Sequence, residues 1–258
     1  MALNPLGTTG LEVSPIGFGA FKIGRNQKTK YTEHYELPEP PQVDALLNTI
    51  LEAGINLFDT APAYGVSEER IGSFLRDSGR RERVVLATKV GEQFDERGSR
   101  WAFDRASVDA SIDQSLHRLG TDHLDIVNVH SDGNDLEIIE RTDVLETLAM
   151  RRERGDVGVI GFSGKTLEGH RRAIDHPVGI RVLMIELNLE ETSQMPILDA
   201  AADRGVGVLI KKGLASGRAD AEASLAWLLG HEAISSVVIG SNSAAHMCQN
   251  LALARAMR

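Results

Sequence analysis

The stretch that decides the fold runs from residue 54 to residue 65 and reads Gly-Ile-Asn-Leu-Phe-Asp-Thr-Ala-Pro-Ala-Tyr-Gly. Its apolar part, Ile55 to Phe58, predicts a short buried strand that ends on the carboxylate of Asp59. A turn containing Pro62 follows, and Tyr64 comes next in the same turn. This unit, a buried strand that ends on a titratable side chain, recurs further along the chain.

Two later apolar runs end in the same way. Residues 84–88 lead into Lys89, and residues 124–129 lead into His130. In a parallel α/β barrel the chemistry sits at the C-terminal ends of the strands. The sequence therefore predicts that Asp59, Lys89 and His130 lie near one another at one end of a barrel.

The alternation of apolar runs with helical periodicity extends over the whole chain. Continuous apolar runs such as residues 206–210 are typical of parallel strands that are buried on both faces. We therefore expect an α/β protein, a (β/α)8 TIM barrel in a single domain of residues 1–258, with an N-terminal β-hairpin in residues 5–15. The eight expected strands are residues 16–20, 55–58, 84–88, 124–129, 157–162, 181–187, 206–210 and 236–239.

The segments between these strands predict amphipathic helices, the first of them from Gln42 onward. Ser67 is expected to cap the second helix, and Gly120 to end the third. Residues 24–41 are expected to form a loop. A doubly wound open sheet is the competing fold, and it is disfavoured because no Gly-x-Gly-x-x-Gly turn follows the first strand. The remaining helices are expected at 67–75, 107–119, 143–154, 166–175, 192–204, 220–229 and 244–257.

Composition limits the partners and the compartment. The formal net charge of -9 over 258 residues argues against nucleic acid or an anionic membrane as a partner. The single cysteine, Cys248, allows no intramolecular disulfide, which fits a reducing cytoplasm. We find no apolar run of the roughly 20 residues that span a bilayer and no signal-peptide pattern at the N-terminus. A cytoplasmic protein is expected, and its oligomeric state stays open.

Tyrosine, lysine, aspartate and histidine form a set that can transfer a proton. A free phenol has a pKa of about 10, and a neighbouring ammonium should lower that pKa by favouring the phenolate. A carboxylate beside the lysine keeps the lysine charged and in position, and a histidine can orient a substrate carbonyl. The set suits protonation of an oxygen that becomes an alkoxide. No side chain supplies hydride, so a reduction would need a nicotinamide cofactor.

Each of these residues also has a purely structural interpretation. Asp59 could cap a helix, Lys89 could be a solvated charge at a strand end, Tyr64 could pack in a loop, and His130 could be a structural histidine. The joint pattern favours a site, because successive strand–helix units place their polar residues at the same end. Neither His-Glu-x-x-His nor a comparable spacing indicates a metal site.

The stretch at residues 57–65 resembles the signature of the aldo-keto reductases. The resemblance covers nearly the whole chain, including Lys89, His130 and the segments at 159–163, 214–217 and 239–251. It implies a catalytic tetrad of Asp59, Tyr64, Lys89 and His130, with the phenol as proton donor. It also implies a small carbonyl substrate that is reduced to an alcohol, and NADP(H), with NAD(H) as the alternative, bound at the C-terminal face of the barrel.

The family's cofactor positions are only partly matched. The family often has an asparagine at Gly164, a glutamine at Met184 and an aromatic residue at Lys211, and basic residues where this chain has Asn242 and His246. The nicotinamide ring is therefore expected to be held differently, and the cofactor phosphate less firmly. The implied cofactor-binding residues are Gly19, Ala20, Asp59, Ser163, Gly164, Lys211, Lys212, Gly213, Leu214, Gly240, Ser241, Asn242, Ser243, His246, Gln249 and Asn250.

Several alternatives stay open at this point. Ser243 and His246 either hold the adenosine phosphate, or cap a helix and face solvent, and Lys211 or Lys212 would then be the next candidates. Phe94 and Trp101 either line the substrate pocket or pack in loops. A cofactor-binding sensor with little turnover is a second hypothesis. A lyase or isomerase that uses Lys89 as a Schiff base is a third.

Overall fold

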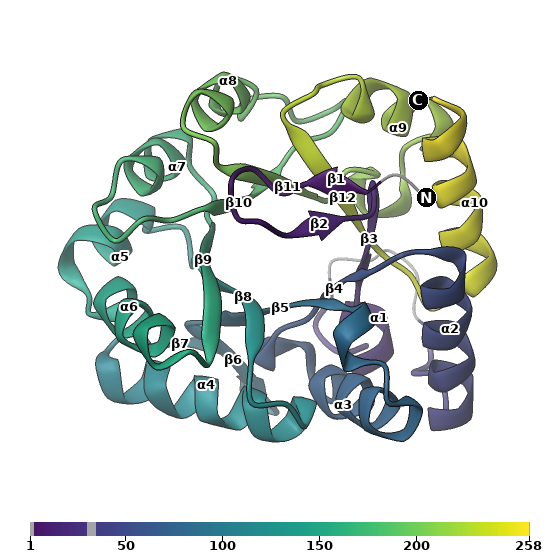
Figure 1. Cartoon of the computed structure of the whole chain (residues 1–258), viewed down its shortest axis with the longest axis horizontal. Helices are drawn as coiled ribbons and strands as arrows, with labels where there is room; N and C mark the ends of the chain where they lie inside the picture. Colours follow the sequence, from purple (N-terminus) through teal and green to yellow (C-terminus); the bar gives the residue numbers. More distant parts are fainter. Residues whose placement is uncertain (1–2, 30–34, 258) are drawn as a thin grey trace.

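The structure is a computed structural model that describes residues 3–29 and 35–257 of the chain. The expected loop at residues 24–41 lies partly outside the described residues, which leave out 30–34. Eight parallel strands close into a barrel, with helices around the outside (Figure 1). The barrel strands are β3 (Ile16–Gly19), β4 (Leu57–Asp59), β5 (Val85–Val90), β8 (Leu124–His130), β9 (Val157–Ser163), β10 (Val182–Glu186), β11 (Gly207–Lys211) and β12 (Ile234–Gly240).

Closure decides between the two folds that the sequence allowed. The last strand, β12, pairs in parallel with the first, β3, so that Gly240 lies opposite Gly19. An open doubly wound sheet has no such pairing, and that alternative is wrong. The predicted TIM barrel is confirmed, and most strand ends lie within about two residues of their expected positions, a normal uncertainty for boundaries.

An antiparallel hairpin of β1 (Asn4–Pro5) and β2 (Glu12–Val13) precedes the barrel, as predicted. Leu6 and Val13 are fully buried and pack against apolar side chains of the barrel interior. The backbone N–H of Thr8 donates to the carbonyl of Gly205 at 2.8 Å, just before β11 begins. The hairpin therefore covers the N-terminal end of the barrel, which leaves the opposite end for a site.

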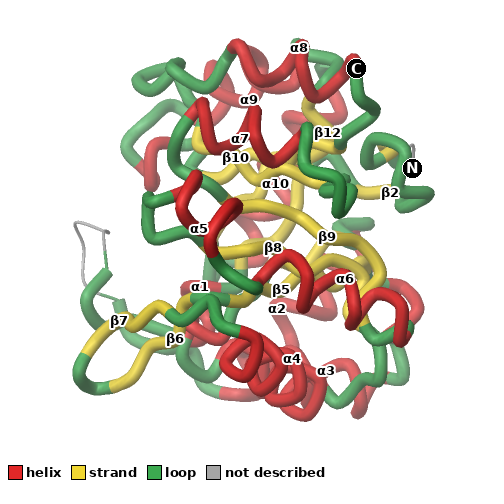
Figure 2. Tube along the Cα trace, turned by 90° about the vertical axis from the view of Figure 1, so that its left-hand side faces the viewer, coloured by secondary structure: helices red, strands yellow, loops and turns green. Residues whose placement is uncertain are grey.

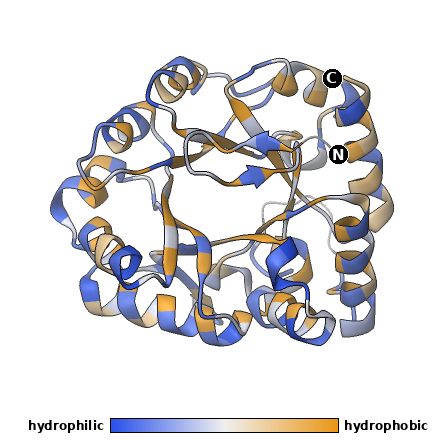
Figure 3. Ribbon diagram, viewed as in Figure 1, coloured by the Kyte–Doolittle hydropathy of each residue, from blue (hydrophilic) through white to orange (hydrophobic). Residues whose placement is uncertain are grey.

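Eight helices follow the strands and bury one face against them. Figure 2 shows helices on the outside of the strands, and Figure 3 shows that these helices carry both apolar and polar residues. One large apolar cluster fills the space between the helices and the strands, and a smaller one fills the barrel interior. The helices are α2 (Pro40–Ala53), α3 (Ser67–Ser78), α4 (Arg105–Leu119), α6 (Val144–Arg154), α7 (Leu167–Ile174), α8 (Pro196–Asp203), α9 (Ala221–Leu229) and α10 (Ala244–Ala256).

Helix ends follow the sequence signals in two cases and depart from them in a third. Gly120 ends α4 in the left-handed conformation, at φ 63°, and the Ser243 hydroxyl caps α10. The expectation for Ser67 was wrong. Its hydroxyl lies 2.6 Å from that of Thr60 and does not cap α3, which begins after Val66. The hydroxyl is buried with Thr60, so it has a nearer partner than the helix N-terminus.

Several elements lie in segments that the sequence indicated only as loops. They are α1 (Phe21–Gly24), α5 (Asp135–Arg141), a hairpin of β6 (Glu92–Asp95) and β7 (Gly98–Trp101), and 3-10 turns at Pro62–Tyr64, Arg81–Arg83 and Ala215–Gly217. Figure 2 shows the β6–β7 hairpin projecting from the barrel. Its strands are short and only partly buried, so they lack the continuous apolar runs that revealed the barrel strands.

Candidate active site

The C-terminal rim of the barrel collects the chain's polar strand ends. Seven of the eight barrel strands place their last residue at the C-terminal rim, and β5 places its penultimate residue, Lys89, there. The register places Gly240 beside Gly19, and Gly19 beside Asp59, with Glu186 beside Lys211 further round. The rim residues are Gly19, Asp59, Lys89, His130, Ser163, Glu186, Lys211 and Gly240.

Asp59 and Lys89 form a buried ion pair. The ammonium of Lys89 lies 2.7 Å from each carboxylate oxygen of Asp59 and 2.8 Å from the carbonyl of Thr60. Their side chains are only 1% and 4% exposed. Burial alone would lower the pKa of Lys89, but the charge of Asp59 outweighs it and the pKa is raised. Lys89 is therefore a fixed cation at neutral pH and lacks the free lone pair that a Schiff base requires.

Tyr64 reaches this pair from the 3-10 turn that follows β4. The Lys89 nitrogen lies 4.7 Å from the centre of the Tyr64 ring, and the ring meets Phe21 and His130 edge to face. Burial raises the pKa of Tyr64 to about 12, and the lowering effect of Lys89 does not offset it. Lys89 acts on this pKa in the expected direction, but the larger effect of burial, which was not anticipated, leaves the pKa raised. The phenol keeps its proton at neutral pH and can donate it.

His130 completes the cluster and brings in a residue that the sequence analysis missed. Its Nδ1 lies 2.9 Å from Oε2 of Glu92, on β6. Burial lowers the pKa of His130, although Glu92 acts in the opposite direction. Burial would also raise the pKa of Glu92, but hydrogen bonds from His130 and Ser99 hold it at about 2. A carboxylate three residues after the strand-end lysine was the available signal.

Lys211 is a second lysine at the rim, and it has different partners. Its nitrogen donates to the Ser163 hydroxyl at 2.9 Å and to the Gly164 carbonyl at 2.8 Å. Burial lowers the pKa of Lys211 to about 7, with the charges of Lys212 and Lys89 acting in the same direction. Lys212 forms its own ion pair with Glu186. The position where the family often has an aromatic ring thus carries an amine that is near its titration midpoint at neutral pH.

The glycine at position 164 has a steric cause. A Cβ placed there would lie 2.6 Å from the Phe162 ring, 2.9 Å from Oδ2 of Asp135 and 2.9 Å from Nε2 of His170. The Asp135 carboxylate is held by backbone N–H groups of Lys165 and Thr166, so it cannot move away cheaply. An asparagine would not fit here without rearrangement. Met184 is buried in the barrel interior, below the rim.

The candidate phosphate-binding residues gather where α10 begins. Ser241 is buried, and its hydroxyl accepts from the N–H of Ser243 at 3.0 Å. The Ser243 hydroxyl accepts from the N–H of His246 at 3.3 Å, which is a helix cap. The Ser243 hydroxyl is therefore the cap of α10 in the free protein. Of the other candidates in this segment, Asn242, His246 and Gln249 are exposed and Asn250 is buried.

The remaining candidates lie around the rim. Ala20 follows β3 directly, and its N–H donates to the Asp59 carbonyl at 2.8 Å. Gly213 and Leu214 follow β11, and a Cβ on Gly213 would lie 2.8 Å from Val237. Phe94 stacks under the guanidinium of Arg25, which is 3.4 Å from its centre. This contact favours the loop-packing interpretation of Phe94.

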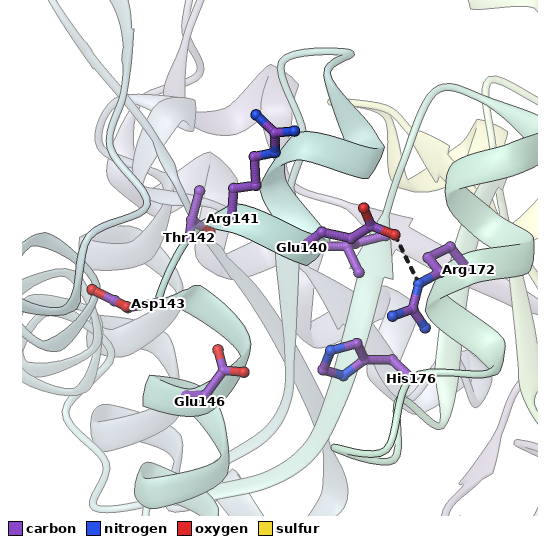
Figure 4. Close-up of a pocket in the computed structure, with 8 residues that line it drawn as sticks. Glu140, Arg141, Thr142, Asp143, Glu146, Arg172 and His176 are labelled. Carbon is purple, nitrogen blue, oxygen red and sulfur yellow. Dashed lines mark hydrogen bonds and ion pairs between the residues drawn. The ribbon is translucent and has the colours of Figure 1, made fainter.

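Two hollows lie away from this cluster. Trp101 is 41% exposed and lines a hollow between the β6–β7 hairpin and α4. A polar crevice lies on the outer helices α5, α6 and α7, where Arg172 donates to Glu140 at 3.0 Å (Figure 4). The crevice contains none of the predicted site residues. Its lining is Ile139, Glu140, Arg141, Thr142, Asp143, Glu146, Arg172 and His176.

Residues 15–224 of the chain match the family model of the aldo/keto reductase family. This match agrees with the cluster of aspartate, tyrosine, lysine and histidine at the barrel rim. The chain belongs to the aldo-keto reductase family. Over residues 3–29 and 35–257, no helix could cross a membrane, and no group of histidine, cysteine or acidic residues could hold a metal ion.

Individual aldo-keto reductases resemble the chain to different extents. A putative aldo-keto reductase of known structure from Pseudomonas aeruginosa is 39% identical with a TM-score of 0.90, over 99% of this chain and 94% of that one. L-galactose dehydrogenase from Arabidopsis thaliana is 30% identical over 96% of this chain and 75% of that protein. Aldo-keto reductase YhdN from Bacillus subtilis is 29% identical over 84% of this chain, which spans only 63% of YhdN.

Proposed function

We propose that this aldo-keto reductase is an NADP(H)-dependent oxidoreductase, with NAD(H) as the alternative, that interconverts an aldehyde or ketone and its alcohol. The observation that carries the proposal is the buried ammonium of Lys89. It lies 2.7 Å from both oxygens of Asp59 and 4.7 Å from the centre of the Tyr64 ring. A cation held this firmly beside a phenol stabilises the charge that forms when the phenol gives up its proton.

Each tetrad residue has a role in the reduction. When bound, the nicotinamide cofactor supplies the hydride. Tyr64 gives its proton to the carbonyl oxygen, since a pKa of about 12 keeps the phenol protonated beforehand. Lys89 stabilises the phenolate that remains, and Asp59 holds Lys89 in place. His130, beside Tyr64 at the rim, contacts the same substrate oxygen.

The rim has features that suit a nicotinamide cofactor. Gly19 and Gly240 face each other without side chains, and a Cβ on Gly19 would lie 3.3 Å from the nitrogen of Gly240. Bare backbone of this kind lets a flat ring approach closely. Ser163 would hold the carboxamide after Lys211 releases its hydroxyl. The start of α10, with Ser243 and His246, would take the adenosine phosphate, because a helix N-terminus favours an anion.

Substrate specificity is proposed to lie in the segments that follow β3, β5 and β8. The β6–β7 hairpin is one of them, and it brings Glu92 against His130. The similarity to a protein named L-galactose dehydrogenase supports hydroxylated substrates of the sugar class.

The test follows the absorbance of the reduced cofactor with NADPH and NADH over a panel of aldehydes, ketones and sugars. Turnover by the parent and a large loss in Tyr64→Phe, with cofactor binding retained, is the expected result. Tight cofactor binding without turnover on any substrate would favour the sensor hypothesis instead. Borohydride trapping of a lysine adduct with a carbonyl substrate would favour the lyase or isomerase hypothesis.

A further inference from the structure

The side chain of Lys211 reaches across the rim to a strand that does not neighbour its own. Lys211 ends β11, which pairs with β10 and β12. Its amine nevertheless donates to the hydroxyl of Ser163, at the end of β9, at 2.9 Å, and to the carbonyl of Gly164 at 2.8 Å. Ser163 lies opposite His130 in the register of β8 and β9, and His130 meets Tyr64 edge to face. The amine of Lys211 is therefore held close to the tetrad.

A positive charge on Lys211 has no counter-charge in contact with it. Among the residues that the structure describes, its hydrogen bonds go only to the uncharged hydroxyl and carbonyl. The two carboxylates that face it, Glu186 and Asp135, are engaged elsewhere. Glu186 forms an ion pair with Lys212, and Asp135 accepts from two backbone N–H groups. The charge of Lys211 therefore acts on whatever binds beside it.

The amine gains or loses its charge near neutral pH. Burial is the largest cause that brings the pKa of Lys211 to about 7; two other lysines act in the same direction, and two carboxylates act against it. Two histidines also face it, and burial lowers the pKa of each, so that both are uncharged at neutral pH. These groups are Lys89 on β5, His130 on β8, Asp135 on α5, His170 on α7, Glu186 on β10 and the adjacent Lys212.

A nicotinamide that serves the tetrad has to lie beside this amine. The ring must touch the substrate carbon whose oxygen meets Tyr64 and His130, because hydride passes directly between them. The hydroxyl of Ser163, on the strand next to His130, is a polar group at this place that suits the carboxamide of the ring. Lys211 bonds to that hydroxyl, so its charge acts on any ring that is bound there.

We propose that Lys211 makes the site bind the reduced nicotinamide more tightly than the oxidised one, because the oxidised ring carries a positive charge and the reduced ring carries none. The inference rests on the proposed function, since it needs a nicotinamide at this rim. The amine can donate to the carboxamide oxygen of either form, but an ammonium without a counter-charge repels only the oxidised ring. This selection suits carbonyl reduction, because the oxidised product competes poorly with the reduced cofactor.

The selection weakens as the pH rises, because Lys211 without its proton no longer repels the oxidised ring. Linkage requires the reverse effect as well, so the oxidised cofactor lowers the pKa of Lys211 more than the reduced cofactor does. A difference of roughly one pKa unit between the two complexes corresponds to a tenfold difference in relative affinity. The preference for the reduced form is therefore largest below the pKa of Lys211 and is lost above it.

The first test measures the dissociation constants of NADPH and NADP⁺ from pH 5.5 to pH 9, with the full chain and no carbonyl or alcohol present. The dissociation constant of NADP⁺ divided by that of NADPH should fall roughly five- to tenfold over this range. Ionisation of the adenosine phosphate is common to both cofactors and cancels in the ratio. NADH and NAD⁺ should give the same fall, because the charge lies on the ring. A ratio that does not change with pH, or that falls only for the phosphorylated pair, overturns the proposal.

Lys211→Met should make this ratio independent of pH and lower it in acid towards the value of the parent at pH 9. Lys165→Met is the matched control, because its ammonium donates to the exposed carbonyl of Asp132 at 2.8 Å and lies outside the candidate site. It should keep the pH dependence of the parent. A pH dependence in Lys211→Met that equals that of the parent overturns the proposal, and so does its loss in Lys165→Met.

The second test reads the charge on Lys211 itself. The seven lysines of the chain are labelled with ¹³C and followed by NMR over the same pH range, alone and with each cofactor. The signal that titrates near pH 7 and is absent from Lys211→Met belongs to Lys211. Its pKa should be roughly one unit lower with NADP⁺ than with NADPH, in agreement with the change in the binding ratio. Equal pKa values in the two complexes, or no lysine that titrates in this range, overturns the proposal.

The two tests separate this inference from the proposed function, because neither needs turnover. If the cofactors bind with the expected selection and no substrate of any class turns over, the proposed function fails while the role of Lys211 stands. If turnover depends on Tyr64 and the binding ratio is constant with pH, the proposed function stands and the role of Lys211 is wrong. If no nicotinamide cofactor binds, both are wrong.

Discussion

Lys89 and Lys211 lie at the same rim of the same barrel, and their environments move their pKa values in opposite directions. Lys89 is the more deeply buried, yet its pKa is raised, because it contacts both oxygens of Asp59. Among the residues that the structure describes, Lys211 donates hydrogen bonds only to the uncharged Ser163 hydroxyl and Gly164 carbonyl, and its pKa falls to about 7. The charge of the partner, more than the depth of burial, decides whether a lysine stays a cation.

This difference gives the two halves of the rim different chemistry. The half around Lys89 holds a permanent cation beside a phenol, as proton transfer to an oxygen requires. The half around Lys211 holds an amine that titrates near neutral pH and bonds to the residues expected to hold the nicotinamide carboxamide. Substitutions in the two halves should therefore change different properties of the protein.

The largest effect is expected for Tyr64→Phe, which removes the group through which Lys89 acts. The rate of turnover should fall on the order of 10²–10⁴-fold, the usual contribution of a general acid. Lys211→Met is the comparison variant, and its loss should appear mainly in cofactor affinity rather than in the rate of the loaded enzyme. Steady-state kinetics with cofactor titrations measure both. Near-parental turnover by a folded Tyr64→Phe protein would remove Tyr64 from the mechanism.

Asp59→Asn should leave Lys89, like Lys211, with only uncharged hydrogen-bond partners. The variant leaves a buried ammonium without its counter-charge, and breaking a buried pair in this way costs about 3–5 kcal/mol of unfolding free energy. Urea unfolding measures the loss, and the surface variant Asp203→Asn is a control that should cost less than about 0.5 kcal/mol. Equal stability of the two variants would show that Asp59 is not what keeps Lys89 charged.

The pH dependence of stability should have opposite signs for the two lysines. The pKa of Lys211 is about 7 in the folded protein and 10.5 in the unfolded chain, so between these values the unfolded chain binds more protons. Its contribution makes the unfolding free energy rise with pH in that window. Lys89 has a raised folded pKa, so its stabilising contribution is full below pH 10.5 and is lost only as the pH rises through that folded pKa.

Urea unfolding of the parent and of Lys211→Met at several pH values checks this prediction. The curve of Lys211→Met against pH should lack the rise that Lys211 contributes above about pH 7. Because Lys211 is only partly buried, solvent screens part of the effect. Parallel curves for the two proteins would contradict the lowered pKa of Lys211.

The smallest effect is expected at the exposed start of α10, where a charge is fully solvated. His246→Arg places a permanent cation near the proposed adenosine phosphate, and an exposed ion pair contributes about 0.5–1 kcal/mol, or roughly two- to fivefold in affinity. The dissociation constant of NADH divided by that of NADPH should rise by this factor, because NADPH binds more tightly. Ala252→Arg, at an exposed position further along α10 and outside the candidate site, is the control. An unchanged ratio would place phosphate recognition elsewhere, with Lys212 the next candidate.

Sequence reasoning was most successful where a pattern is local. Asp59, Lys89 and His130 each stand at the end of an apolar run, and each lies at the barrel rim as expected. Sequence reasoning did not find Glu92 as a site residue, because the β6–β7 hairpin is short and half-buried and has no long apolar run. It also failed on the direction of the Tyr64 pKa. The attraction to Lys89 could be anticipated from chemistry, but the larger effect of burial could not.

The sequence by itself determined that these side chains meet, because parallel strands in a closed barrel all end at the same rim and any residue at a strand end is brought there. Only the tertiary structure decided what each side chain meets. The pairing of Lys89 with Asp59, of Lys211 with Ser163, and of His130 with Glu92 joins segments from different strands or loops. Desolvation and Coulomb energies depend on these distances and on the surrounding protein, and neither is encoded in spacing along the chain.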